Sequence, residues 1–312
     1  MAVTISKTFY PPFGYCIKLA NGDAEALVTI EVGPRVISYK TSDGRNLFYN
    51  DIDGVAFTED PRIKETFGKK RYDFRGGHRM SLSPENVPYT YYPDDEPLHW
   101  TAIENGAVFT QKPQPVVDYQ YEMTVVMAES GTGLTVTEKI TNLRDEKREA
   151  AAWGITQMEK GGLAVCPQKA DLSVSPLPDR IISVWPYAQL CDKRFRASSR
   201  YITLKQDVNA EGAFKFGANI LEGWTGYILG TQMFVKKFPP YIKGESYPDF
   251  GVNYESYTDK GALEVECLSP FKLIGKGESV SLTEQWFILE NVAPPNREDD
   301  AAFADYMDSL KI

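Results

Sequence analysis

The chain has 312 residues with 34 basic and 43 acidic side chains, so its formal net charge is −9. No run rich in lysine and arginine stands out, which argues against a nucleic-acid partner and against binding to an anionic membrane surface. The sequence also has no apolar run near the roughly 18 residues that a membrane-spanning helix needs, and its first residues lack the basic start and apolar stretch of a signal peptide.

The cysteines indicate a reducing compartment. Cys16, Cys166, Cys191 and Cys267 are far apart in the sequence and form no CxxC pair. Disulfide frameworks are typical of short secreted chains, and this chain is long. We therefore expect isolated, reduced thiols in a cytoplasmic protein.

The first hundred residues mix strands with irregular stretches. Residues 25–50 contain short β-branched runs broken by Gly, Asp and Pro, which is typical of a sandwich or barrel. Residues 51–74 are polar and irregular. Residues 75–100 hold both histidines, His78 and His99, among prolines, carboxylates and tyrosines, so we predict a long loop. Such loops are usually functional or disordered, and the many aromatic side chains favour a packed loop that forms one wall of a binding site.

Strands return after residue 100. Residues 118–130 and 133–142 are joined by a glycine-containing turn, and the second segment places Leu134, Val136, Glu138 and Ile140 on one face, which predicts an antiparallel hairpin. Residues 151–158 favour a strand over the short helix that the preceding EKREAAA allows. Short strands are then expected at residues 163–166, 171–175, 179–185, 199–204 and 212–217.

The last ninety residues predict a core hairpin, a loop, two strands and a helix. The hairpin covers residues 223–238, and the loop, at 237–253, is rich in Pro, Gly and aromatic residues and contains Asp249. Residues 262–275 and 278–291 are expected to form a closing pair of strands. Apolar residues at helical spacing predict a helix at 299–310 on the outside of the sheets. No repeat of about 20–50 residues is present, so the economical architecture is all-β: one large antiparallel β-sandwich, a single domain over 1–312.

Common catalytic motifs are missing from the sequence. There is no G-x-S-x-G elbow, P-loop or G-x-G-x-x-G turn, so no cofactor is expected. His78 and His99 lack the i, i+4 spacing of helical zinc motifs. Asp94, Asp95 and Glu96 offer oxygen ligands for a hard cation such as calcium, but a solvated acidic loop tip explains them more simply. We therefore predict no metal site.

Aromatic residues and carboxylates instead suggest a sugar-binding cleft. Flat rings suit the C–H faces of sugars, and charged or amide side chains suit the hydroxyls. Glu264 and Glu266 fall on one face of a predicted strand, which is either outer surface or the lining of a polar cleft. In a cleft, one of the two carboxylates would have a raised pKa and act as a general base. The candidate aromatic residues are Tyr91, Tyr92, Trp100, Trp185, Tyr187, Trp224, Tyr241 and Tyr247.

Three segments resemble one known family. They are GLTVTEKITNLRDEKREAAAWGITQ, LEVECLSPFKLIGKGESVSLTEQWFI and RGGHRMSLSP…PLHW. Together they are similar, over about residues 25–290, to the galactose mutarotase-like superfamily of aldose 1-epimerases, and specifically to a bacterial branch of it. The resemblance implies a β-supersandwich fold and the interconversion of sugar anomers, in which a glutamate accepts the anomeric proton and a histidine protonates the ring oxygen.

The resemblance also implies roles for individual residues. It makes Glu264 the base and His99 the acid, with His78 in reserve. Trp153 stands near the position where many members have a second histidine, so a sugar-binding relative without turnover remains an alternative. A lyase or hydrolase, or a phosphosugar ligand held by Arg75, Arg79, Lys236 or Lys237, also stays open. The residues expected to bind the sugar are Arg75, Glu85, Tyr92, Trp100, Trp153, Asp249 and Glu266.

Overall fold

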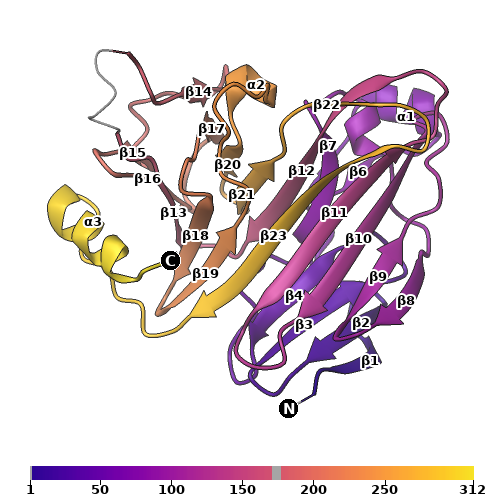
Figure 1. Ribbon diagram of the computed structural model, residues 1–312, viewed down its shortest axis with the longest axis horizontal. Helices are drawn as coiled ribbons and strands as arrows, with labels where there is room; N and C mark the ends of the chain where they lie inside the picture. Colours follow the sequence, from indigo (N-terminus) through magenta and orange to yellow (C-terminus); the bar gives the residue numbers. More distant parts are fainter. Residues whose placement is uncertain (1, 171–176) are drawn as a thin grey trace.

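The computed structural model describes residues 2–170 and 177–312, and it consists mainly of two large sheets (Figure 1). Neighbouring strands pair antiparallel in both sheets. The first sheet has the order β1 (Thr4–Phe9), β2 (Tyr15–Ala20), β3 (Ala24–Thr29), β4 (Val36–Thr41), β7 (Gly77–Ser83), β12 (Arg148–Met158), β21 (Leu263–Leu268), β20 (Tyr254–Thr258), β17 (Phe214–Ala218) and β14 (Ile182–Val184), with β22 (Lys272–Ile274) paired to the start of β12.

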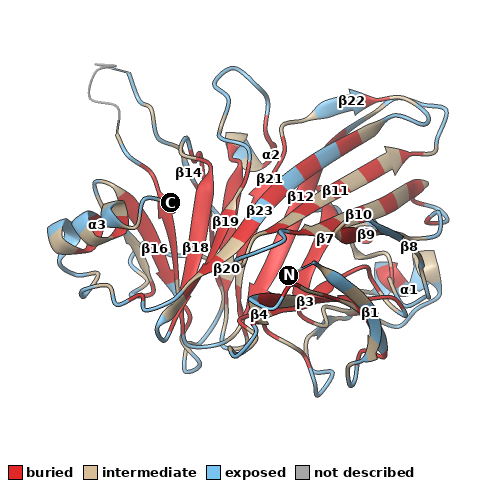
Figure 2. Ribbon diagram, turned by 60° about the horizontal axis from the view of Figure 1, so that its bottom comes forward, coloured by how far each residue is buried: buried red, intermediate tan, exposed pale blue. Residues whose placement is uncertain are grey.

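The second sheet packs its inner face against the first. Its order is β15 (Phe195–Ala197), β16 (Tyr201–Lys205), β13 (Leu163–Pro167), β18 (Trp224–Leu229), β19 (Gln232–Lys237), β23 (Ser279–Leu289), β11 (Leu134–Asn142), β10 (Tyr119–Met127), β9 (Gly106–Thr110) and β8 (His99–Ile103). One core cluster contains buried side chains from both sheets, among them Val28, Met123, Val265 and Trp286. Figure 2 shows this buried layer along the central strands.

The remaining elements are small. Strands β5 (Phe57–Thr58) and β6 (Tyr72–Asp73) form a two-stranded ribbon, and a single 3-10 turn covers Tyr89–Tyr91. The helices are α1 (Pro61–Phe67), α2 (Pro248–Gly251) and α3 (Asp300–Ser309). None of the helices in the described residues is long and apolar enough to cross a membrane. Helix α3 packs Phe303 and Met307 on Tyr201 and Trp224, outside the main core, as predicted.

Several predicted elements are confirmed. The hairpin of β10 and β11 pairs Tyr119 with Asn142 and Met127 with Leu134, and its side chains alternate between buried and half-buried. The strand expected at 151–158 lies within β12. The core hairpin expected at 223–238 is formed by β18 and β19. The strand expected at 171–175 lies outside the described residues.

Three predictions are wrong. Residues 75–100 are not one long loop, because they contain β7, the 3-10 turn and the start of β8. The irregular stretch 51–74 includes α1, β5 and β6. The two closing strands do not pair with each other: β21 lies between β12 and β20 in the first sheet, whereas β23 lies between β11 and β19 in the second. Adjacency in sequence suggested a hairpin, but β21 and β23 belong to opposite layers of the sandwich.

Candidate functional site

A cavity of about 510 Å³ lies over the outer face of the first sheet. Strand β21 alternates its side chains, so Leu263, Val265 and Cys267 point into the core and Glu264 and Glu266 point outward. The neighbouring strands β7, β12, β17 and β20 add outward-facing residues, and the segments around residues 49–58, 85–91 and 185–187 form the walls. The polar cleft that the sequence allowed for Glu264 is therefore present in the structure.

Glu264 is held by its neighbours on two strands. Gln157 of β12 lies directly opposite it in the sheet register and donates a 2.9 Å hydrogen bond to its Oε1. The Nη1 atom of Arg79, on β7, is 3.7 Å from the same oxygen. Burial raises the pKa of Glu264 to about 7, and the charge of Glu266 adds to this rise, while Arg79 opposes it. At neutral pH this carboxyl group can therefore either accept or donate a proton.

Glu266 belongs to a buried ionic group beneath the cleft. Its Oε2 accepts hydrogen bonds from Trp153 Nε1 at 2.8 Å and from Lys215 Nζ at 2.9 Å. The Lys215 ammonium is also 2.7 Å from Glu255. Burial by itself lowers the pKa of Lys215, but the charges of Glu255 and Glu266 outweigh it and raise this pKa well above its usual value. Lys215 is thus a cation fixed by two carboxylates.

Aromatic rings surround this lysine and form one wall. The Nζ atom of Lys215 lies 4.7 Å from the ring centre of Trp153 and 4.8 Å from that of Trp185. Trp185 and Tyr187 both line the cavity. Flat faces of this kind are the surfaces on which sugar rings stack.

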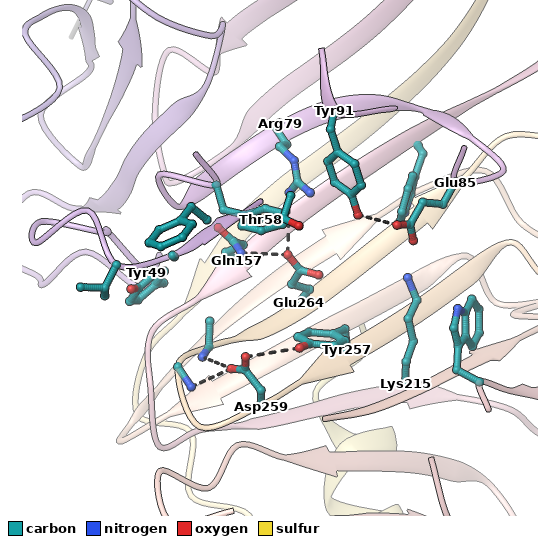
Figure 3. Close-up of a pocket in the computed structure, with 18 of the residues that line it drawn as sticks. Tyr49, Thr58, Arg79, Glu85, Tyr91, Gln157, Lys215, Tyr257, Asp259 and Glu264 are labelled. Atoms are coloured by element: carbon teal, nitrogen blue, oxygen red, sulfur yellow. Dashed lines mark hydrogen bonds and ion pairs between the residues drawn. The ribbon is translucent and has the colours of Figure 1, made fainter. Parts of the chain in front are cut away.

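Two more carboxylates line the cleft (Figure 3). Glu85 accepts a hydrogen bond from the Tyr91 hydroxyl. Asp259 accepts from the backbone N–H groups of Gly261 and Ala262, at 2.7 and 3.1 Å, and from the Tyr257 hydroxyl at 3.3 Å. The cleft therefore offers charged, amide and hydroxyl groups from several strands around one open volume.

Of the residues predicted from the sequence, four gather at this place. Glu264, Glu85 and Trp153 line the cavity, and Glu266 lies beneath it. The aromatic candidates Tyr91, Trp185 and Tyr187 also line it.

Both histidines of the chain lie outside the cleft. His78 points from β7 into the core, where its Nε2 is 2.7 Å from Glu138 and its Nδ1 is 2.9 Å from Thr156. Its ring also contacts Trp286 edge-on. His99 is exposed on the outermost strand of the second sheet, with Nε2 3.1 Å from the Thr101 hydroxyl. The expected meeting of Glu264 with a histidine does not occur in this structure.

The other predicted binding residues also lie elsewhere. Arg75 lines a separate groove and faces Asp73 and Asp94. Tyr92 packs edge-on against Phe67, and Trp100 packs against the core from β8. Asp249, in α2, interacts with the buried Glu255; burial raises the pKa of Glu255 well above its usual value, and Asp249 adds to this rise. Further aromatic candidates are also displaced, because Trp224 is buried beneath α3 and Tyr241 stacks on Tyr247.

The acidic tip of residues 94–96 is neutralised by three different cations. Asp94 binds the buried Arg35 at 2.7 Å, Asp95 binds Lys69 at 2.9 Å, and Glu96 binds Lys112 at 2.9 Å. Within residues 2–170 and 177–312, no group of three or more His, Cys, Asp or Glu side chains is arranged to hold a metal ion.

Some cleft residues were not identified from the sequence as site residues. Gln157 and Lys215 lie in predicted strands that had no assigned role, and Tyr257 and Asp259 lie between the predicted elements. Arg79 was considered only as a phosphate ligand. The alternation of β12 does place Trp153 and Gln157 on one face, a signal that could have linked them.

Solved structures with a known fold are similar to this chain. A galactose mutarotase-like protein from Lactobacillus casei matches with a TM-score of 0.55 and 12% identity, covering 88% of this chain and 100% of that chain. A galactose mutarotase-like protein from Clostridium acetobutylicum has a TM-score of 0.51 and 13% identity, with 93% and 99% covered. A TPR-domain containing protein from Parabacteroides distasonis has a TM-score of 0.56 and 13% identity, with 90% and 49% covered. No family model and no curated protein matches the sequence. The structural matches establish the galactose mutarotase-like fold, as the sequence predicted.

Proposed function

We propose that the cleft over β12 and β21 binds a carbohydrate. The observation that carries this proposal is the placement of Trp153, Trp185 and Tyr187 beside the polar groups of Glu264 and Gln157 in one cavity. A volume of about 510 Å³ falls in the usual range for small-molecule sites. The fold, which this chain shares with proteins described as galactose mutarotase-like, supports the same conclusion.

A thermal-shift and calorimetric screen of mono- and disaccharides tests the proposal. A ligand that binds only the folded state raises the melting temperature. Trp185→Ala should weaken binding by about tenfold, because it removes a stacking face. Phe250→Ala is the matched control, since Phe250 is 94% exposed and is not among the residues that line the cleft. If no sugar binds, or if both variants weaken binding equally, the cleft is not a sugar site.

A second candidate function is the interconversion of anomers, and the environment of Glu264 favours it. A carboxyl group with a pKa of about 7 is suited to accept the proton of an anomeric hydroxyl at neutral pH. Because His78 and His99 both lie elsewhere, the proton for the ring oxygen would have to come from another cleft group or from water. The position of both histidines outside the cleft also favours a protein that binds the sugar without turnover.

Exchange NMR of the α and β forms of a bound sugar separates binding from turnover. An enzyme accelerates the exchange, and Glu264→Gln abolishes the acceleration while the sugar still binds. If wild-type protein binds the sugar but exchange proceeds at the rate in buffer, the protein is a carbohydrate-binding module.

A further inference from the structure

Arg79 is the one charged side chain of the described cleft lining that makes no hydrogen bond. Each of the other four has at least one partner among the contacts given above. Arg79 donates a hydrogen bond to no described residue, and its Nη1 is buried without a hydrogen-bond partner. The charged residues of the lining are Arg79, Glu85, Lys215, Asp259 and Glu264.

Two other buried arginines show what a structural guanidinium looks like in this protein. Arg35 bonds to Asp94 through Nε and Nη2, to Tyr72 through Nη2 and to the carbonyl of Phe74 through Nη1. Arg194 is held by Asp192 and a backbone carbonyl. Arg79 is as buried as Arg194, with 7% and 8% exposed. A buried charged group without hydrogen bonds is costly, so its retention beside a cavity indicates a ligand.

Pairing with Glu264 does not satisfy this guanidinium. The 3.7 Å between Nη1 and Glu264 Oε1 is outside hydrogen-bond range, and that oxygen already accepts from Gln157. Phe74 lies beside the guanidinium, with its ring centre 5.4 Å from Cζ, and offers no acceptor in its side chain. The contact with Glu264 therefore leaves the N–H donors of Arg79 free.

The guanidinium group of Arg79 lies at the cleft, between Gln157 and Tyr91 (Figure 3). A planar guanidinium with free donors matches the paired oxygens of a carboxylate or a phosphate. We infer that Arg79 binds an anionic group of the ligand, so that the cleft takes an acidic sugar in preference to a neutral one. This inference rests on the proposed sugar-binding function.

Calorimetry with four probes tests the inference and identifies the anion. Glucuronate carries a carboxylate, and its neutral counterpart is glucuronamide. Glucose 6-phosphate carries a phosphate, and its neutral counterpart is glucose. We expect one acidic probe to bind at least about tenfold more tightly than its neutral counterpart, since charged hydrogen bonds are strong. Arg79→Gln should remove this preference. Arg62→Gln is the matched control, because Arg62 is exposed on α1 and pairs with Asp60 at the surface.

The possible results separate this inference from the proposed function. Equal binding of acidic and neutral probes, or a preference that survives in Arg79→Gln, overturns the anion site and leaves the sugar cleft standing. Acetate and inorganic phosphate are tested as anions without a sugar. If either binds wild type but not Arg79→Gln, and no sugar binds, the anion site is supported and the sugar function is overturned. If no probe binds, both fail. If Arg79→Gln does not fold, the comparison of glucuronate with glucuronamide on wild-type protein still tests the inference, because equal binding of the two overturns it.

Discussion

Glu264 and Glu266 lie on the same face of β21, yet only Glu266 is bound by a cation at hydrogen-bond distance, the ammonium of Lys215. Glu264 has an amide partner, Gln157, and a guanidinium 3.7 Å away. Burial raises the pKa of Glu264 to about 7, and the nearby charge of Glu266 contributes to the rise. The strand therefore presents one carboxylate that is bound to a cation and one that titrates near neutrality.

The first prediction concerns the titration of Glu264. Carbon NMR of glutamate-labelled protein should show one carboxyl signal that titrates near pH 7 and is absent in Glu264→Gln. Glu266→Gln should move this titration to lower pH, because it removes a negative charge and leaves Lys215 less neutralised. A wild-type Glu264 that titrates near its ordinary value of about 4.3 would contradict the interpretation.

The second prediction links this titration to anion binding. Ionised Glu264 competes for Arg79 and repels an incoming anion, so glucuronate, whose carboxylate is ionised throughout this range, should bind better below pH 7 than above it. Affinity should fall by up to about tenfold per pH unit above the pKa, and Glu264→Gln should flatten the dependence. Calorimetry at about pH 6 and about pH 8 measures this, and an affinity that rises with pH would contradict it. The titratable groups around Glu264 are Arg79, Tyr91, Tyr187, Lys215, Tyr257 and Glu266.

Local patterns in the sequence were sufficient to predict much of the fold. The β10–β11 hairpin was recognisable because its alternation and its glycine turn are local properties. The shared face of Glu264 and Glu266 followed from the two-residue period of a strand. Neither prediction depends on which strands are neighbours in the sheets.

The cleft could not be assembled from such patterns, because its contacts join distant residues. Gln157 and Glu264 are 107 positions apart and meet only through the register of β12 with β21. His78 appeared to stand in a loop because a polar residue at an inward position breaks the alternation of β7. Its partner Glu138 comes from the opposite sheet, so the burial of His78 could not be inferred from neighbouring residues in the sequence.

The third prediction concerns the buried His78. Burial lowers the pKa of His78 well below its usual value, and the charge of Lys236 contributes. Below about pH 6.5 the unfolded chain binds a proton at this position and the folded protein does not, so stability falls as the pH decreases. The loss should be up to about 1.4 kcal/mol per pH unit. Burial raises the pKa of Glu138, whose effect on stability has the opposite sign.

Urea unfolding of wild type and His78→Gln between about pH 6.5 and 5 isolates this contribution. Glutamine keeps a polar group beside Glu138 and Thr156 but cannot titrate in this range. The variant should therefore lose less stability than wild type over the same interval. Equal slopes for the two proteins would mean that His78 is protonated in the folded state as easily as in the unfolded chain.

The fourth prediction concerns Gly154, which makes room for two buried carboxylates. A Cβ atom there would lie 2.5 Å from Oε1 of Glu284 and 3.0 Å from both oxygens of Glu138. Glu284 cannot easily move, because Lys236 and Trp286 both donate to it. Gly154→Ala should therefore destabilise the protein by about 1–3 kcal/mol in urea unfolding.

Gly275→Ala is the control for this substitution. Its added Cβ would lie no closer than 3.5 Å to Glu278, which is an ordinary contact. Its stability should therefore stay within about 0.5 kcal/mol of wild type. Comparable losses in both variants would show that the carboxylates beside Gly154 can rearrange.

The fifth prediction concerns Lys215, the cation between Glu255 and Glu266. Lys215→Met leaves these two carboxylates, which are 1% and 0% exposed, without a positive partner. Removing one member of a buried ionic group costs about 3–5 kcal/mol, because the remaining charge is neither solvated nor paired.

Adding Glu255→Gln to Lys215→Met should restore part of the stability, since one of the two uncompensated charges is then gone. The loss should also shrink at acidic pH, where protons neutralise the carboxylates. Urea unfolding of the single and double variants at two pH values measures both effects, and a single variant as stable as wild type would mean that the carboxylates are already neutral beside Lys215.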